Sequence, residues 1–426
     1  MPPYFVSHSV SKQFDLLKLH QLNPKRYPFL LESLVDSNSA RYNILFAFPQ
    51  ETITSDKHGF LENFAKVHNQ NHHSLDLPFC GGWFLFLDYE LNQEIEPILN
   101  TNHKSKSFAT RIPAAIIQDK LTGLSHFVCE NQYKQCLSLM DSDYQQAQLI
   151  DFEPITDTRI NFTEEDPNIF LASCNRTKEY IIAGDVFQVN LSRLWHGVTE
   201  QNASILYDKL RNQNPASFSG LVVHNNIEII SSSPERLVKV KDSIIETRPI
   251  AGTRHRSENN SSDLKLADEL LSHPKEQAEH IMLLDLERND LGRICYYGSV
   301  EVSELMVLES YAHVHHIVSN VKGKLLENTK PVDIIKAVFP GGTITGCPKV
   351  RCMQIINELE KVPRGAYTGS LGYLNHNGDM DLNILIRTIE KDGNNIKFRA
   401  GSGIVYDSIA QEELKETRHK AKGLKL

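Results

Sequence analysis

Residues 218–250, FSGLVVHNNIEIISSSPERLVKVKDSIIETRPI, decide the fold class. They contain three short apolar runs, SGLVVH, IEIISSS and SIIETRPI, the last of which follows a turn near Lys241–Asp242. Short runs of this kind, bounded by turn signals, predict β-strands. Similar runs fill residues 1 to about 150, and helical patterns do not alternate regularly with the strands. The sequence therefore predicts an α+β sandwich rather than a doubly wound sheet.

Helical patterns lie on both sides of this stretch. Two surround GDVFQVNLSRLW, within residues 167–210, and a strong one runs from about Asp263 to Glu287. Others follow in VRCMQIINELE (350–360) and from about Ala410 to the end. The segment Asp151–Asp166 is polar and contains proline, which is typical of a linker. We expect a β-rich region over residues 1–150 and a catalytic region over 151–426, packed as one intertwined unit.

Composition excludes several classes of protein. The chain has 426 residues and a formal net charge of −8 without a long basic run, which argues against nucleic acid or an anionic membrane as a partner. It has no apolar stretch of about 18 residues that could span a membrane. No signal peptide is evident, and the seven cysteines form no CxxC motif. These features predict a cytoplasmic protein with reduced thiols.

Two acidic pairs stand out in helical segments. Glu276 and Glu279 lie three residues apart in HPKEQAEHIMLLDLERND, so both carboxylates share one helix face. Glu413 and Glu416 repeat this spacing in QEELKET. Four carboxylates facing one pocket would suit Mg²⁺, although two solvated helix faces are the commoner explanation of this spacing.

Glycine-rich turns suggest close backbone approaches. FPGGTITGCPK (339–349) leads into a helix, where backbone N–H groups could meet an anion such as a carboxylate, or form only a tight turn. AGSGIV (400–405) places glycines within a strand pattern, which suggests that something approaches the backbone closely. Neither segment matches a P-loop or a dinucleotide-binding fingerprint.

Three kinds of polar residue interrupt apolar strand patterns. Arg387 in LNILIRTIE needs an anionic partner, either a substrate carboxylate or a structural acid. HVHHIVS supplies His313, His315 and His316, of which one could act as an acid or base, although a histidine that is hydrogen-bonded within the core is the commoner case. Glu235 follows an apolar strand in SSSPERL and could donate a proton if desolvated, or could simply occupy a surface turn.

Seven ordered motifs resemble the chorismate-utilising enzyme family. They are GDVFQVNLSR, SSSPERLV, ETRPIAGTR, AEHIMLLDLERNDLGR, HHIVSNVKGKL, FPGGTITGCPKVRCMQIINELE and AGSGIVYDS followed by E..ET. The resemblance extends from about Phe170 to the C-terminus and is looser before it. It implies an anthranilate-synthase-like fold, a layered β-sandwich flanked by helices with the active site between the layers.

The resemblance also implies roles for individual residues. It implies Mg²⁺ as the cofactor, with Glu276, Glu279, Glu413 and Glu416 around it and Glu279 and Glu416 as direct ligands. Glu235 would be the general acid for the departing 4-hydroxyl, with His316 and Gln188 as further catalytic residues. The implied substrate-binding residues are Thr343, Tyr373, Arg387, Gly401, Ser402, Gly403, Lys420, Ala251, Gly252 and Thr253.

The residue at position 188 bears on whether water or ammonia is added to chorismate. Family members that add water to chorismate carry a lysine at this position, and a neutral glutamine cannot serve as that base. The resemblance therefore implies ammonia as the nucleophile. No glutamine-hydrolysing unit is evident in the chain, so we expect a glutamine amidotransferase subunit as partner.

Two products remain open at this point. Ala251 in PIAGT resembles anthranilate synthases, which make anthranilate and pyruvate for tryptophan synthesis, whereas aminodeoxychorismate synthases often have a nucleophilic lysine there. QVN at 188–190, the absence of an NPSPYMF-like stretch in NQNPASFSGLVV and the short length resemble aminodeoxychorismate synthase component I, which serves 4-aminobenzoate and folate synthesis. We favour the latter, and a non-catalytic chorismate-binding relative is a further alternative.

Overall fold

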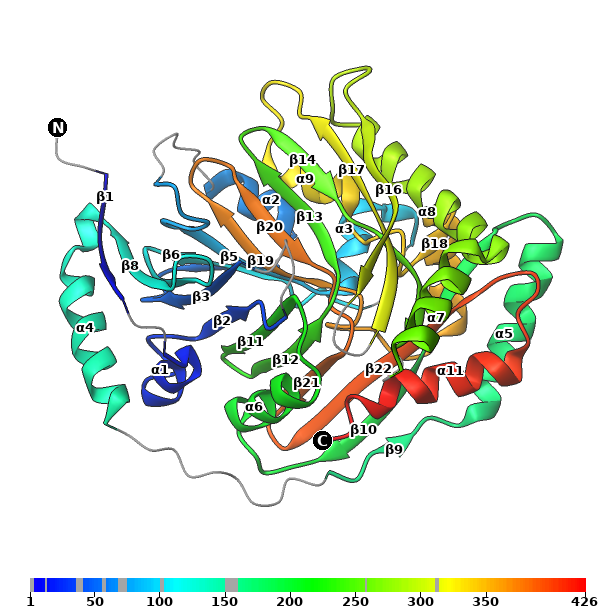
Figure 1. Ribbon diagram of the computed structural model, residues 1–426, viewed down its shortest axis with the longest axis horizontal. Helices are drawn as coiled ribbons and strands as arrows, with labels where there is room; N and C mark the ends of the chain where they lie inside the picture. Colours follow the sequence, from blue (N-terminus) through cyan, green and yellow to red (C-terminus); the bar gives the residue numbers. More distant parts are fainter. Residues whose placement is uncertain are drawn as a thin grey trace.

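The computed structural model describes residues 4–11, 14–35, 41–55, 59–67, 75–99, 103–149, 160–256, 259–310 and 314–426. Helices and strands are mixed along these ranges, and the strands pair into two large antiparallel sheets (Figure 1). The predicted α+β class is confirmed. None of the described helices is both long and apolar enough to span a membrane.

The first sheet carries strands from both ends of the chain. Its order is β1 (Phe5–Val10), β8 (Leu124–Glu130), β7 (Ala114–Asp119), β3 (Tyr42–Ala47), β2 (Phe29–Glu32), β11 (Phe218–His224), β12 (Ile227–Ser233), β21 (Thr388–Asp392), β22 (Asn395–Ile404), β10 (Gln188–Val198) and β18 (Gly346–Cys347). A short strand, β9 (Thr163–Glu164), pairs with β10.

The second sheet is built in the same way. Its order is β15 (Ile250–His255), β17 (Val314–Lys324), β14 (Ile244–Thr247), β13 (Arg236–Lys241), β20 (Met380–Asn383), β19 (Ser370–Asn375), β5 (Gly82–Leu87), β6 (Phe108–Ile112) and β4 (Thr52–Thr54), with β16 (Glu301–Ser310) beside β17. Each sheet thus combines strands from before and after residue 150. The proposed boundary there remains a prediction, because residues 150–159 lie outside the described part of the chain.

An aromatic core joins the two sheets. Phe29 of β2 and Phe84 of β5 stack with ring centroids 4.1 Å apart, and both side chains are fully buried. Along β11, Val222 faces this core while its neighbour Leu221 belongs to a second core on the other side of the first sheet. This alternation follows from the two-residue period of a strand, and it makes the sandwich that the short apolar runs predicted.

Helices cover the outer faces of the sandwich. They are α1 (Leu16–Leu22), α2 (Phe60–Val67), α3 (Asn92–Ile95), α4 (Gln135–Gln148), α5 (Pro167–Ile182), α6 (Ala203–Gln213), α7 (Asn260–Ser272), α8 (Pro274–Gly292), α9 (Pro331–Val338), α10 (Lys349–Leu359) and α11 (Ala410–Lys422), with short 3₁₀ turns at Tyr89–Leu91, Pro97–Leu99 and Asn131–Tyr133. In Figure 1, α5, α7, α8 and α11 gather on the right, around β10 and β22. The C-terminal helix begins at Ala410, as predicted.

Three local predictions were wrong. Residues 218–250 form four strands and the start of a fifth rather than three. RLVKVK makes β13, in which Val238 and Val240 are buried, and the run SIIETRPI divides into β14 and the start of β15. The helix expected over 263–287 is two helices, because Pro274 has no N–H to continue α7. Arg387 does not lie in a strand: it connects β20 to β21 with a left-handed φ of 51°.

Candidate active site

Strands β10 and β22 form one wall of the candidate site. They pair antiparallel, with Asn190 opposite Gly403 and Ser192 opposite Gly401. Gly401 and Gly403 are two residues apart and therefore face the same side. A Cβ atom on Gly403 would clash with the Gln188 amide, so the missing side chains let polar groups approach this strand closely.

Gln188 connects this wall to α8. Its Nε2 donates a hydrogen bond of 2.9 Å to Oε1 of Glu279. Gln188 is buried, and its Oε1 has no hydrogen-bond partner among the described residues. Two predicted site residues that are 91 positions apart in sequence are thus in direct contact.

Helix α11 also contacts the Gly401–Gly403 segment. The Ser402 hydroxyl donates to the Glu413 carboxylate, and Lys420 Nζ donates to the Gly401 carbonyl oxygen at 3.0 Å. Lys420 also forms a 2.7 Å ion pair with Glu416, one helical turn earlier. The two acidic pairs therefore belong to helices that both reach the Gly401–Gly403 segment.

Glu235 lies where the chain passes from the first sheet to the second. It follows β12, precedes β13, and is only 5% exposed. Burial raises the pKa of this carboxyl to about 7, and a 2.8 Å hydrogen bond from Thr343, a backbone hydrogen bond from Ile250 and the charge of Lys420 partly offset that rise. A carboxyl with a pKa near 7 can donate a proton at neutral pH.

His316 comes from the second sheet, on β17. Burial lowers its pKa to about 4, and the positive charge of Arg387 acts in the same direction. A backbone hydrogen bond with Gly252 opposes that shift. His316 is therefore neutral at physiological pH. Arg387 and Gly252 both lie close to it.

Strand β15 carries the PIAGT segment past His316. The backbones of Ala251 and Thr253 pair with Ile317 and His316, but their side chains lie outside the described part of the structure. Gly252 has a left-handed φ of 68°, and a Cβ atom there would lie 3.0 Å from Glu276 Oε2. The turn in β15 thus needs a glycine and brings the backbone to the first glutamate of α8.

Arg387 contributes a positive charge near His316. Its Nη1 donates a 3.4 Å hydrogen bond to Asn214 Oδ1, and burial lowers the pKa of its guanidinium. Of the two partners that the sequence left open, a structural acid and a substrate carboxylate, the first does not appear among its hydrogen bonds with described residues. A half-buried guanidinium in this position can take an anionic ligand.

The four glutamates have the donor chemistry of a hard cation site. Glu276 pairs with Arg254 at 3.2 Å, and the other three are held by Gln188, Ser402 and Lys420 as given above. Carboxylate oxygens are the ligands that Mg²⁺ prefers, so the residue types fit. Within the described ranges, however, no group of three or more His, Cys, Asp or Glu side chains is assembled to hold a metal ion.

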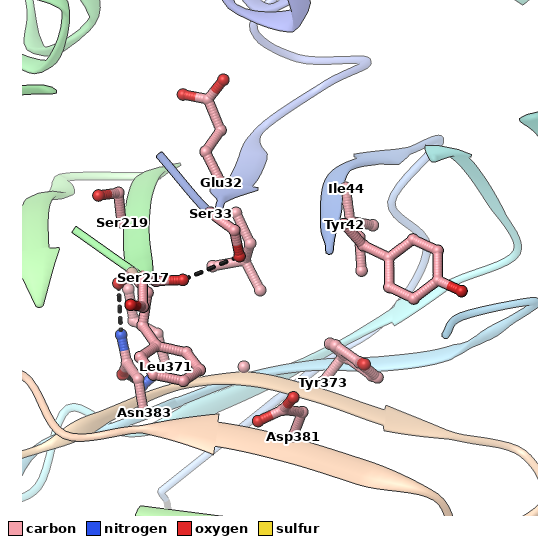
Figure 2. Close-up of a pocket in the computed structure, with 13 residues that line it drawn as sticks. Glu32, Ser33, Tyr42, Ile44, Ser217, Ser219, Leu371, Tyr373, Asp381 and Asn383 are labelled. Atoms are coloured by element: carbon pink, nitrogen blue, oxygen red, sulfur yellow. Dashed lines mark hydrogen bonds between the residues drawn. The ribbon is translucent and has the colours of Figure 1, made fainter. Parts of the chain in front are cut away.

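Tyr373 is the predicted site residue that the structure places elsewhere. It lies on β19 and lines a cavity of about 80 Å³ between the sheets, opposite Ser33 and Ser217 (Figure 2). Its ring contacts Phe46 and Phe79. The cavity is bounded in part by the YPFLLES and NPASFSG segments.

Tyr367 is a site residue that the sequence reasoning missed. A Cβ atom on Gly401 would lie 2.5 Å from the Tyr367 hydroxyl oxygen and 2.7 Å from Asn190 Oδ1. Tyr367 is buried, and burial raises its pKa to about 12, so it stays a hydrogen-bond donor. The glycine in AGSGIV indicated a close approach, but it did not identify the tyrosine that makes it.

Gly403→Ala tests this wall. The new methyl group must push Gln188 away from Glu279, since the two cannot share the space. We expect catalytic turnover to fall by about 100-fold, the typical effect of a misplacement near 1 Å in an active site. Gly292→Ala, at a glycine with nothing within 4 Å of its Cβ position, is the control and should keep full activity. Equal rates for both variants would contradict the assignment.

Comparison with known proteins identifies the family. The family model described as chorismate binding enzyme matches residues 29–425. An anthranilate synthase component I-like protein from Synechocystis is 43% identical over 360 residues, which span 82% of this chain and 73% of that protein. Aminodeoxychorismate synthase component 1 from Bacillus subtilis is 50% identical over 260 residues, 61% of this chain but only 55% of that protein.

Solved structures agree with these matches. Anthranilate synthase component I from Streptococcus pneumoniae superposes with a TM-score of 0.81 at 33% identity, over 93% of this chain and 94% of that one. This confirms the anthranilate-synthase-like fold. The chain therefore belongs to the chorismate-binding enzyme family, as its seven motifs suggested.

Proposed function

We propose that the chain is an aminodeoxychorismate synthase component I, which adds ammonia to chorismate to give 4-amino-4-deoxychorismate. The observation that carries this proposal is the buried Glu235, whose pKa of about 7 suits a general acid, beside a site in which Gln188 replaces a basic residue. Glu235 would protonate the departing 4-hydroxyl oxygen. Gln188 cannot deprotonate water, so a nucleophile that is already reactive when neutral, such as ammonia, is favoured.

The positive groups of the site would hold the substrate's carboxylates. Lys420 lies against Gly401, and Arg387 lies close to His316. Tyr367, which is buried near Gly401, and Thr343, which is half-buried beside Glu235, can donate hydrogen bonds at this site. Fixed donors in a water-poor site stabilise developing charge without reorganisation. His316, neutral at physiological pH, would pack beside the ring and would not add another positive charge.

Mg²⁺ is proposed as the cofactor. Glu276 and Glu279 from α8, with Glu413 and Glu416 from α11, would hold it, Glu279 and Glu416 directly. When bound, it would neutralise the ring carboxylate against this acidic wall. Arg254 and Lys420, which pair with two of the glutamates in the structure, would then be free to change partners.

A glutamine amidotransferase subunit is the proposed source of ammonia. The relatives from Bacillus subtilis and Aquifex aeolicus are named component 1 of their synthases, a name that implies a second component. A cytoplasmic location is proposed with it, supported by seven cysteines that are all free of disulfides.

Anthranilate synthase component I is the second candidate. It is favoured by Ala251, since an alanine at this position cannot attack the ring as the lysine of many aminodeoxychorismate synthases does. Relatives with both names match this chain.

An assay with purified chain, chorismate, Mg²⁺ and an ammonium salt tests the proposal. We expect a product that the downstream lyase converts to 4-aminobenzoate. Formation of fluorescent anthranilate without the lyase would establish the second candidate. Bound chorismate that is never turned over, under any nitrogen source, would indicate a non-catalytic relative.

A further inference from the structure

His280 is a buried polar residue for which the proposed chemistry has no use. It lies on α8, directly after Glu279 and one helical turn after Glu276, and it is 0% exposed. The side chains at 276, 280 and 284 form one stripe along the helix. Leu284 in that stripe is buried in the apolar core of the second sheet, so His280 occupies a position where a leucine would pack.

The imidazole spans the gap between α8 and β17. His280 Nε2 and Ser319 Oγ are 2.5 Å apart, and Ser319 is also 0% exposed. Ser319 lies three residues after His316 on the same strand. The hydrogen bond therefore connects the helix that carries two of the four glutamates to the strand that carries the site histidine.

Ser319 is itself held by two other segments of the chain. Its Oγ accepts a 2.8 Å hydrogen bond from the backbone N–H of Met306, a residue with a left-handed φ of 50° at an irregularity of β16. Its backbone N–H donates to the Pro249 carbonyl oxygen at 3.3 Å, just before β15. The contact that receives His280 is thus fixed relative to β15, β16 and β17.

A polar pair of this kind defines position more than it adds stability. His280 Nδ1 has no hydrogen-bond partner among the described residues, and an apolar side chain would avoid that cost. An apolar side chain at position 280, however, could not form the hydrogen bond that fixes α8 at one position relative to β17. A slip by one residue moves a helix by about 1.5 Å and turns it by about 100°, which would carry Glu276 and Glu279 away from the site.

We propose that His280 is a positioning residue that locks α8 against Ser319 and thereby holds Glu276 and Glu279 in place for the divalent cation. The inference rests on the proposed function, because it assigns these glutamates to Mg²⁺. The side chain of His280 is directed to Ser319, so no contact with the substrate or the metal is assigned to it. It acts through the helix, in the way that residues behind a metal site set its affinity.

The test measures Mg²⁺ binding directly, by calorimetric titration of the full-length chain with MgCl₂, together with melting temperature. His280→Leu and Ser319→Ala each remove the hydrogen bond, and both should weaken Mg²⁺ binding by about tenfold or more. The double variant should be no weaker than the singles, because the two changes break one interaction. His280→Gln, which can still reach Ser319, should stay within about threefold of the unmodified chain.

Leu291→Ala is the matched control for simple destabilisation. Leu291 is fully buried near the far end of the same helix, so its loss should lower the melting temperature without changing Mg²⁺ affinity. An unchanged dissociation constant in Ser319→Ala, or an equal loss in Leu291→Ala, would overturn the proposal. If the unmodified chain binds Mg²⁺ and the variants behave as expected, but no chorismate is consumed, the proposed function fails and the role of His280 stands.

Discussion

Glu235→Gln is expected to reduce kcat by about 10²- to 10⁴-fold, the usual contribution of a general acid. The amide keeps the size of the carboxyl and can still accept from the Thr343 hydroxyl, but its N–H protons are too weakly acidic to be transferred to the leaving hydroxyl. Chorismate binding, measured by titration calorimetry, should therefore stay close to that of the unmodified chain. Steady-state kinetics at saturating chorismate, Mg²⁺ and ammonium provide the measurement.

The pH dependence gives the same assignment an independent signature. Glu235 must be protonated to act, so activity is present below its pKa of about 7 and is lost as the pH rises through that value. The profile of kcat/KM reports the free enzyme and should show this fall. Glu287, a buried carboxyl whose pKa is also raised to about 7, lies within electrostatic reach of Glu235, so the variant is needed to assign the fall.

The residual activity of Glu235→Gln should show no such loss above pH 7. Glu246→Gln, a carboxyl on β14 whose nearest basic partner is Lys239 at 3.9 Å, serves as the control and should behave like the unmodified chain. A Glu235→Gln enzyme with nearly full activity, or with the same loss above pH 7, would remove the carboxyl from the mechanism.

Glu416→Ala should abolish Mg²⁺-dependent turnover while the fold stays intact. The variant removes one proposed direct ligand, and added Mg²⁺ cannot replace a missing carboxylate. Stability should change little, since the side chain is 48% exposed and its ion pair with Lys420 is worth at most about 1 kcal/mol. Removing it also relieves like-charge repulsion with Glu413, three residues earlier. The measurements are the turnover rate of the variant and of the unmodified chain over a series of Mg²⁺ concentrations, and a melting curve for each.

Glu412→Ala provides a control on the same helix. Glu412 pairs with Lys415 at 2.7 Å on the exposed face, outside the acidic pair that reaches Ser402 and Lys420. The control should keep the activity and Mg²⁺ requirement of the unmodified chain. If Glu416→Ala turned over chorismate at an unchanged rate, the ligand assignment would be refuted.

The fold class could be predicted from the sequence because strand length and turn signals depend on residues that are close together in the chain. The same local reasoning failed where neighbouring strands or backbone geometry decided the outcome. Strand β13 was missed because Lys239 and Lys241 make its sequence look polar, although Val238 and Val240 are buried in the second sheet. Arg387 looked like a strand residue because its neighbours are apolar, but its left-handed backbone ends the strand pattern there.

The candidate site could be predicted in part, where its residues lie close together along one helix. Spacing along one helix predicted that Glu276 shares a face with Glu279, and Glu413 with Glu416. It could not predict that α8 and α11 would both reach the Gly401–Gly403 segment, which depends on how the sheets pack. Tyr367 and Tyr373 illustrate this limit. Both lie close after a glycine in sequence, and only the three-dimensional structure shows which one faces Gly401.

The identity of the product tests the central claim most directly. The chain would be incubated with chorismate, Mg²⁺ and ¹⁵N-labelled ammonium, and the product analysed by mass and fluorescence. The account predicts a labelled 4-amino-4-deoxychorismate that still carries the enolpyruvyl group and yields 4-aminobenzoate with the lyase. An unlabelled product formed by water, or chorismate recovered unchanged, would contradict amination, and labelled anthranilate would assign the chain to the alternative product.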